Sequence, residues 1–243
     1  MAPIPDPLPH PPDDAGQAAW RSQPIYSRGD DILFAKVAAA AVVAADAKGW
    51  THASRHLNHY LENKGTGIDP KVDELLRDVP EADRAANKLA ESEIRRIATE
   101  AVSTNNYDNP VQFQAAWLRQ GFYIGPELSE DWYYAMGGIQ MCVTGVTTVH
   151  KPADGAEPSV TVEYKVWVHD RYNWDGKKSV EIAGVTVTDK QMGALHTAGL
   201  AREYDMDGAS GVRRYGGTIP KTAGINLPGA NDSRDGQRSD PTR

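Results

Sequence analysis

The chain has 243 residues, of which 40% are hydrophobic, and it carries a formal net charge of −7 with a sequence pI of about 5.5. This length fits one large domain or two small ones, and it allows a core that needs no disulfide or bound metal. Proteins that bind nucleic acids usually present a basic face, so the acidic balance argues against nucleic acid as a bound partner. The single cysteine, Cys142, excludes an intrachain disulfide.

The first 28 residues begin with MAPIPDPLPHPPDDAGQ, which is rich in proline and acidic residues. Such a composition offers little to bury and predicts a flexible leader over residues 1–28. It lacks the basic start and apolar core of a secretory signal, so we expect a cytoplasmic protein or one exported by a specialised non-Sec system. Residues 216–243 have a similar composition and are predicted to form an irregular tail.

Helical spacing of apolar residues predicts helices throughout residues 30–120. The most apolar run, residues 32–47, is interrupted by Lys36 and is rich in alanine. A bilayer span needs roughly 20 strongly apolar residues. The run is therefore predicted to be a packed helix, and no transmembrane segment is expected. The last helix of this region is predicted over residues 110–120, PVQFQAAWLRQ.

A β-ribbon is predicted over residues 132–187, where β-branched residues become frequent. In SVTVEYKVWVHD every second residue is valine or tyrosine, which is the pattern of a strand with one buried face. The preceding KPADGAEP is typical of a loop, so residues 138–170 are predicted to form one long antiparallel hairpin. Thr188 and Gln191 have the spacing of a capping box and open a closing helix over residues 188–204.

These elements predict the α+β class. A two-stranded ribbon is not stable alone, so the ribbon must pack on the helices. We therefore expect a single α+β domain over residues 29–215: an N-terminal helical bundle packed on a long antiparallel β-hairpin, with a closing C-terminal helix.

Three histidines in HASRHLNHY indicate a possible metal site. His52, His56 and His59 follow one another at i, i+4 and i+7, and histidines at i and i+4 on one helical face can bind one ion. Glu62 is the next residue along that face. This pattern allows a metal-dependent hydrolase, but it also fits a half-exposed polar face whose charge changes with pH.

The stretch DRYNWDGKKS, residues 170–179, resembles the middle of a calcium-binding loop. With Gly176 in the sixth position, Arg171 would occupy the first position and Ile182 the twelfth, where carboxylates are required. The stretch is therefore interpreted as a strand exit that is followed by an Asp-Gly turn at Asp175.

The polar residues of this exit form a candidate catalytic group together with the closing helix. An acid–base arrangement of Asp170, Arg171 and His196 with Arg202 or Glu203 is one interpretation. The alternative is a set of hydrogen bonds that fixes the closing helix on the ribbon.

Aromatic residues before and after the ribbon form a second candidate site. Trp132, Tyr133 and Tyr134 precede the ribbon, and Tyr172 and Trp174 follow it, so these rings would gather near one end of the hairpin. Exposed rings of this kind suit a sugar, a partner protein or a membrane interface, and they suit a core equally well.

The segments HASRHLNHYLENKGT, WYYAMGG, VTGVTTV, YKVWVHDRYNWDGKK and VTDKQMGALHTAGLAREYDMDG carry a resemblance over residues 50–210. They resemble a module found as the C-terminal region of larger actinobacterial secreted proteins of the polymorphic-toxin kind. The resemblance implies a bacterial delivered effector or toxin-like protein, with secretion machinery and an immunity or partner protein as its partners. It implies no reaction, and cofactors are unknown. A non-catalytic interaction or structural protein with flexible docking tails is the alternative, beside the metal-dependent hydrolase.

Overall fold

The structure is a computed structural model that describes residues 2–12, 18–153, 156–174, 179–182 and 185–230. It combines helices with an antiparallel sheet and belongs to the predicted α+β class. The helices are η1 (Ile25–Ser27), α1 (Gly29–Ala47), α2 (Thr51–Leu61), α3 (Val72–Asp78), α4 (Pro80–Thr104), α5 (Glu130–Ala135) and α6 (Asp189–Ala198). The strands are β1 (Pro110–Gln114), β2 (Phe122–Tyr123), β3 (Gly138–His150), β4 (Ser159–Tyr172), β5 (Ser179–Ile182), β6 (Val185–Thr188), β7 (Tyr204–Ala209) and β8 (Arg213–Thr218).

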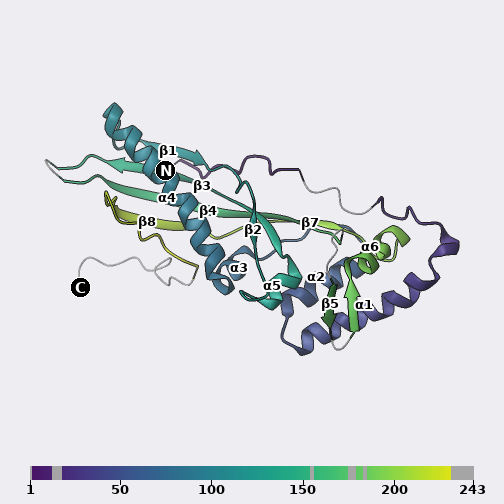
Figure 1. Cartoon of the computed structure of the whole chain (residues 1–243). Coiled ribbons are helices and arrows are strands. Elements are labelled where there is room, and N and C mark those ends of the chain that lie inside the picture. The colour runs from purple at the N-terminus through teal and green to yellow at the C-terminus, as the bar shows by residue number, and fades with distance from the viewer. Residues whose placement is uncertain (1, 13–17, 154–155, 175–178, 183–184, 231–243) are drawn as a thin grey trace.

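The centre of the main sheet is the predicted long hairpin of β3 and β4 (Figure 1). The pairing runs from Gln140 opposite His169 to His150 opposite Ser159. Strands β1 and β2 pair with the other side of β3, whereas β7 and β8 pair with the other side of β4. The sheet is thus four strands wide, with two short strands along each edge. Strands β5 and β6 form a separate two-stranded hairpin.

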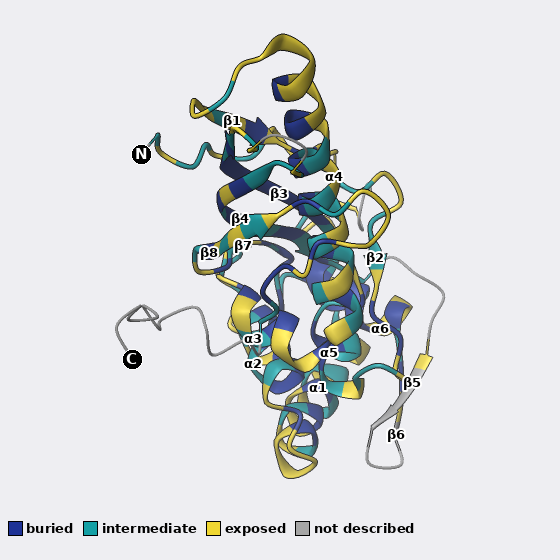
Figure 2. Cartoon of the chain, turned by 90° about the vertical axis from the view of Figure 1, so that its left-hand side faces the viewer, coloured by how far each residue is buried: buried dark blue, intermediate teal, exposed yellow. Residues whose placement is uncertain are grey.

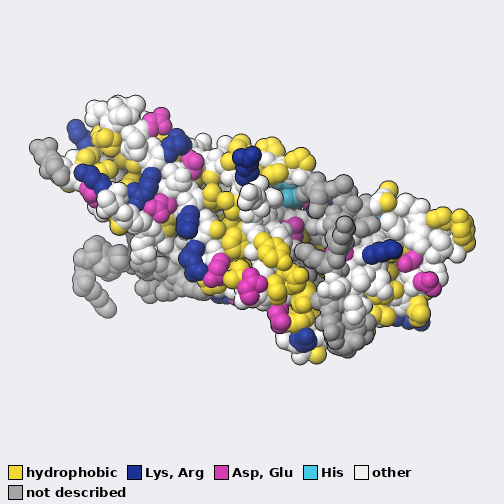
Figure 3. Space-filling view, viewed as in Figure 1, with side chains coloured by type: hydrophobic (Ala, Val, Ile, Leu, Met, Phe, Trp, Pro, Cys, Tyr) yellow, Lys and Arg dark blue, Asp and Glu magenta, His cyan; other side chains and the backbone are white. Residues whose placement is uncertain are grey.

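Helix α4 packs against one face of the sheet, and the first core lies between them (Figure 2). The helix presents Ala82, Ala86 and Ala90 in successive turns, and such small side chains allow close approach to the strands. The sheet contributes the alternate residues of β4 that the sequence pattern predicts to be buried: Val160, Val162, Tyr164, Val166 and Val168. On the outward side of α4, acidic and basic side chains are interspersed (Figure 3).

A second core lies at the far end of the hairpin, between α1, α2, α6 and the ends of β4 and β7 (Figure 1). Its largest side chains include Tyr60, Leu195 and Tyr204. The predicted capping box of α6 is present. The helix ends at Ala198, earlier than predicted, because Gly199 adopts the left-handed conformation with φ +75°.

The predicted helix over residues 110–120 is wrong, because Pro110–Gln114 form strand β1 along β3. Phe113 points into the first core, whereas Gln112 and Gln114 lie on the other face of the sheet. The predicted irregular tail begins within β8, which extends to Thr218 and pairs with β4. Beyond it, Ile225 and Leu227 pack into the first core. Residues 231–243 lie outside the described part of the chain.

The proline-rich N-terminal segment, residues 2–12, lies against the sheet face opposite α4 (Figure 2). Further along, the backbone N–H groups of Arg21 and Gln23 donate to carbonyls near the end of α6. These contacts differ from the flexible leader that the composition predicts, although residue 1 and residues 13–17 lie outside the described chain. Among the helices of the described residues, none is both long enough and apolar enough to cross a membrane.

Candidate functional site

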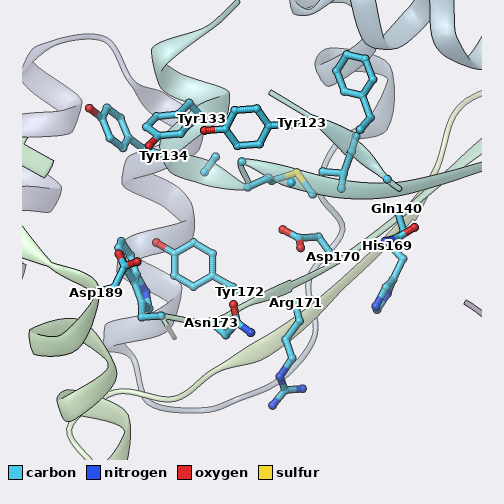
Figure 4. A pocket seen from close by; sticks show the side chains of 18 of the residues that line it. Tyr123, Tyr133, Tyr134, Gln140, His169, Asp170, Arg171, Tyr172, Asn173 and Asp189 are labelled. Carbon is cyan, nitrogen blue, oxygen red and sulfur yellow. The ribbon is translucent and has the colours of Figure 1, made fainter. Parts of the chain in front are cut away.

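A pocket of about 690 Å³ opens between α5, β2, the end of β4 and the start of α6 (Figure 4). It lies where the two cores meet, because Met136, which lines it, packs against both. Its lining includes these polar or aromatic residues: Tyr123, Tyr133, Tyr134, His169, Asp170, Arg171, Tyr172, Asn173, Trp174 and Asp189.

Two contacts at its start hold helix α5 in place. The Ser129 hydroxyl accepts the Trp132 backbone N–H at 3.3 Å. The Asp131 carboxylate accepts the backbone N–H groups of His52 and Ala53, at 3.1 and 2.7 Å, in the first turn of α2. A carboxylate at a helix N-terminus satisfies amides that have no partner within the helix. Asp131 therefore fixes α5 against α2, and with it one wall of the pocket.

Three tyrosines form this wall. Tyr133 and Tyr134 are consecutive residues of α5, and Tyr123 belongs to β2. The rings of Tyr133 and Tyr123 meet edge-on with centroids 6.2 Å apart, and their hydroxyl groups share a hydrogen bond. Burial, then the neighbouring Tyr123 and Tyr134 and the carboxylate of Asp189, raise the pKa of Tyr133. Tyr133 is therefore neutral at physiological pH, and its hydroxyl group can donate as well as accept a hydrogen bond.

The opposite wall is formed by the end of β4, whose alternate residues point to opposite sides (Figure 4). Asp170 and Tyr172 point toward the row of tyrosines, whereas His169 and Arg171 point away from it. Tyr172 is almost fully buried, and burial together with the nearby Asp170 carboxylate raises its pKa. Asp189, the first residue of α6, adds a second, buried carboxylate to the lining.

The structure divides the predicted catalytic group. On the side of β4 away from the tyrosine row, Arg171 Nη1 lies 2.7 Å from Asp205 Oδ1, and its Nη2 lies 3.6 Å from Glu203 Oε2. His196 Nε2 lies 3.9 Å from the same Glu203 oxygen. These groups join α6 to β4 and β7, whereas Asp170 faces the pocket.

The protonation state of His196 follows from its partners. The backbone N–H of Glu203 donates to His196 Nδ1 at 3.2 Å, so the neutral ring carries its proton on Nε2. Burial and the guanidinium groups of Arg171 and Arg202 lower the pKa of His196. A neutral, buried imidazole of this kind fixes packing, which is the alternative that the sequence left open.

Arg202 is positioned by a separate contact. Its guanidinium lies 4.5 Å from the centre of the Trp20 ring, with Arg21 also stacked on this ring at 4.1 Å. Arg202 Nη1 donates to the carbonyl of Lys64 at 3.4 Å. Within the described residues, neither Arg202 nor His196 lines the pocket.

The predicted histidine group does not converge on a point. The His52 ring stacks on Trp132 with centroids 3.8 Å apart, and its Nε2 lies 3.8 Å from the carboxylates of Glu74 and Asp78. Burial lowers the pKa of His52, although the surrounding carboxylates oppose this shift. Trp132 is itself buried and donates its indole N–H to Asp78, so it is a core residue rather than part of an exposed aromatic surface.

The other two histidines have different partners. His56 is fully buried, and its Nδ1–H donates to the Ala135 carbonyl at 2.9 Å, while burial lowers its pKa to about 4. His59 Nε2 lies 2.7 Å from the Thr66 carbonyl and its Nδ1 lies 3.6 Å from Glu62. Among the described residues these imidazoles do not form a set that could bind one ion, and they lie outside the pocket lining.

A different trio, His10, His169 and Asp207, brings one possible ligand atom each within 4.8 Å. The two imidazoles are stacked 3.5 Å apart with only 17° between their planes. Nitrogen lone pairs lie in the ring plane, so stacked rings direct them in parallel rather than toward one ion. The arrangement therefore suits a ring stack, with His169 Nδ1 2.7 Å from Asp207.

Sequence reasoning found Asp170, Arg171, Tyr172 and Trp174 of the pocket, and it placed Tyr133 and Tyr134 among the aromatic residues that gather at one end of the hairpin. It missed Tyr123 and Asp189, although the capping box that places Asp189 at a helix start was a visible signal. The predicted Asp-Gly turn at Asp175 lies outside the described residues. The chain matches no protein family model, no curated protein and no solved structure.

Proposed function

We propose that the chain is a ligand-binding protein whose functional site is the pocket between the tyrosine row and the end of β4. The observation that carries the proposal is a cavity of about 690 Å³ with aromatic rings on one wall and carboxylates on the other. Cavities that bind small ligands typically have 300–1,000 Å³ and combine aromatic walls with a few polar groups.

The chemistry of the lining selects a class of ligand. Asp170 and Asp189 repel anions, whereas the guanidinium of Arg171, which also belongs to the lining, points away from the tyrosine row and is paired with Asp205 (Figure 4). Carboxylates and the Asn173 amide accept hydrogen bonds from hydroxyl groups, while tyrosine rings pack on the apolar faces of a sugar. The ligand is therefore a neutral or cationic, hydroxyl-rich molecule of the sugar type, and phosphorylated compounds are disfavoured.

Titration of the purified full chain with chitotetraose, cellotetraose and glucosamine, followed by tryptophan fluorescence, tests the proposal. Trp174 lines the pocket and reports occupancy. Saturable binding of at least one compound is expected. Asp170→Asn and Tyr134→Ala should weaken binding at least tenfold.

Matched controls lie far from the pocket lining. Asp46→Asn replaces an exposed carboxylate on α1, and Tyr26→Ala removes a ring that is 91% exposed. Both should bind as the unmodified chain does. Absence of saturable binding, or equal affinity in the pocket and control variants, would refute the assignment.

The resemblance to polymorphic-toxin modules adds a biological setting to the proposal. In that setting the chain is a delivered effector, and the pocket is where it engages its target. Expression inside a susceptible bacterial cell should then slow growth, and Asp170→Ala should relieve the effect while Asp46→Ala does not. Normal growth with the chain expressed in each cellular compartment would count against the effector role but not against ligand binding.

A further inference from the structure

The segment of residues 2–12 has proline at positions 3, 5, 7, 9, 11 and 12. Proline fixes its own φ near −65° and biases the preceding residue toward extended conformations, so this segment is extended before it makes any contact. Proline also lacks an N–H group, so four of the seven backbone donors of residues 3–9 are missing. The segment lies on the face of the sheet, where its carbonyl groups need donors from side chains.

Those carbonyls are met by side-chain donors on the sheet face opposite α4. Four hydrogen bonds are made: Gln112 Nε2 to the Pro3 carbonyl at 2.7 Å, Thr144 Oγ1 to Pro5 at 2.6 Å, Gln114 Nε2 to Asp6 at 2.6 Å and Trp117 Nε1 to Leu8 at 2.8 Å. The donors come from β1, β3 and the segment after β1. Every acceptor is a backbone carbonyl, so these contacts depend on the extended conformation of the segment and not on its side chains.

One of the donors, Thr144, is held in position without help from the segment. Trp167 Nε1 donates to Thr144 Oγ1 at 2.9 Å, which leaves the Thr144 hydroxyl proton directed at the Pro5 carbonyl. A cavity of about 420 Å³ lies beside this contact, between Leu8, Trp117, Trp167 and Ala209. At the far end His10 stacks on His169, with ring centroids 3.5 Å apart.

We propose that this face of the sheet is a recognition groove for extended peptides with proline at alternate positions. Residues 2–12 are its resident occupant, and a proline-alternating segment of another polypeptide competes for the same place. Proline-rich peptides are recognised elsewhere through aromatic side chains and donors to their carbonyls, because their stiffness reduces the entropy lost on binding. Here the donors are Gln112, Thr144 and Trp117, and the aromatic side chains are those of Trp117 and Trp167.

The test uses the synthetic peptide APIPDPLPHPP, residues 2–12, carrying a fluorophore. Fluorescence anisotropy is measured with the full chain and with a chain that lacks residues 1–12. The shortened chain is expected to bind saturably, and the full chain at least tenfold more weakly, because its own segment competes at a high effective concentration. A peptide with alanine at positions 3, 5, 7 and 9 should bind at least tenfold more weakly.

Trp117→Phe in the shortened chain removes one donor and keeps the ring, so binding should weaken about 3–10-fold. The control is Trp20→Phe, which removes an indole donor to Asn63 far from the groove and should leave binding unchanged. A folded shortened chain that does not bind the peptide, or that binds the alanine peptide equally well, would overturn the proposal.

A second measurement covers the case in which the shortened chain does not fold. A protease site is placed within residues 13–17 of the full chain and cut after folding. Labelled peptide should then replace the cut segment within hours. A cut segment that never exchanges with excess peptide would show that it is a structural part of the sheet, and one that leaves without being replaced would exclude recognition. A twofold increase in mass before cutting would identify a second copy of this chain as the donor of the segment.

Discussion

His56 is the residue whose burial has the clearest energetic consequence. It is fully buried, its Nδ1 is bound to the Ala135 carbonyl, and its Nε2 has no hydrogen-bond partner among the described residues. The neutral tautomer fits this environment, whereas a protonated ring would bring a second N–H and a charge into the core. The pKa is lowered from 6.5 to about 4 for this reason.

The stability of the protein should therefore depend on pH through His56. Between pH 6.5 and pH 4 the unfolded chain binds a proton at His56 that the folded chain does not bind. The free energy of unfolding is thus expected to fall as the pH decreases through this range, by up to about 3 kcal/mol. Urea unfolding at several pH values measures how steeply the free energy of unfolding changes with pH. His56→Gln should make the slope less steep, the remainder coming from His52 and His196, whose pKa values burial also lowers, and His150→Gln, which changes a half-exposed histidine, should not.

Asp83 and Arg213 form a pair that the sequence did not reveal. Arg213 of β8 is almost fully buried, and its Nη1 lies 2.7 Å from Asp83 Oδ1 on α4. Removing one member of such a pair leaves the other charge buried without a counter-charge.

Asp83→Ala is expected to reduce the free energy of unfolding by about 3–5 kcal/mol. The matched control is Glu81→Ala, because Glu81 pairs with Arg84 on the exposed side of the same helix, and exposed pairs contribute less than about 1 kcal/mol. Chemical denaturation of both variants compares them. Equal losses would contradict the assignment of Asp83 as the buried counter-charge.

At the scale of elements, the start of α6 depends on its capping box. The Thr188 hydroxyl accepts the Gln191 backbone N–H at 3.2 Å, and the Gln191 side chain accepts the Thr188 N–H at 3.1 Å. Thr188→Ala should cost about 1 kcal/mol and lower the melting temperature by about 2–4 °C. Thr188→Ser keeps the oxygen and should retain most of the stability. Melting curves recorded by circular dichroism measure both effects. A serine variant as unstable as the alanine variant would contradict the stabilising role of the Thr188 hydroxyl.

The success of sequence reasoning also differs between elements for physical reasons. The capping box and the alternation of β4 are local patterns, and both are confirmed. Strand β1 has only five residues and contains a single β-branched one, Val111, so its own sequence favours neither helix nor strand. Its strand conformation is determined by pairing with β3. Strand β8, RRYGGT, is likewise defined by its partner β4 rather than by its own composition.

The pocket could be predicted only in part, because it is assembled from distant segments. Asp170 and Trp174 stood out as polar and aromatic residues at a strand exit, but nothing local places Tyr123 or Asp189 beside them. The prediction from the histidines failed for a different reason: their spacing put them on one side of α2, but each has a different partner, Trp132, Ala135 or Thr66. Helical spacing predicts that side chains lie on the same face of a helix, but it does not predict that they converge on one ion.

At the scale of the whole molecule, the two cores are linked through β4. Val166 and Val168 belong to the first core, and Tyr172 of the same strand belongs to the second. Met136 packs against both. Because one strand is shared, opening the second core should also weaken the pairing that holds the first, and the two are expected to unfold together.

Leu195→Ala tests this coupling, since Leu195 is fully buried in the second core. The substitution should cost about 2–5 kcal/mol, and the loss should appear in the hydrogen exchange of the most protected amides of α4, in the first core. Val43→Ala, on an exposed position of α1, should leave these amides unchanged. Faster exchange confined to α2 and α6 would show that the cores open separately.

The alternation at the end of β4 restricts how the chain can vary in evolution. Asp170 and Tyr172 belong to the pocket, while His169 supports the proline-rich segment on the opposite face. An inserted or deleted codon within the strand would exchange the two sets of side chains and damage both surfaces at once. The length of β4 is therefore expected to stay constant in descendants that keep either surface, even where its sequence diverges.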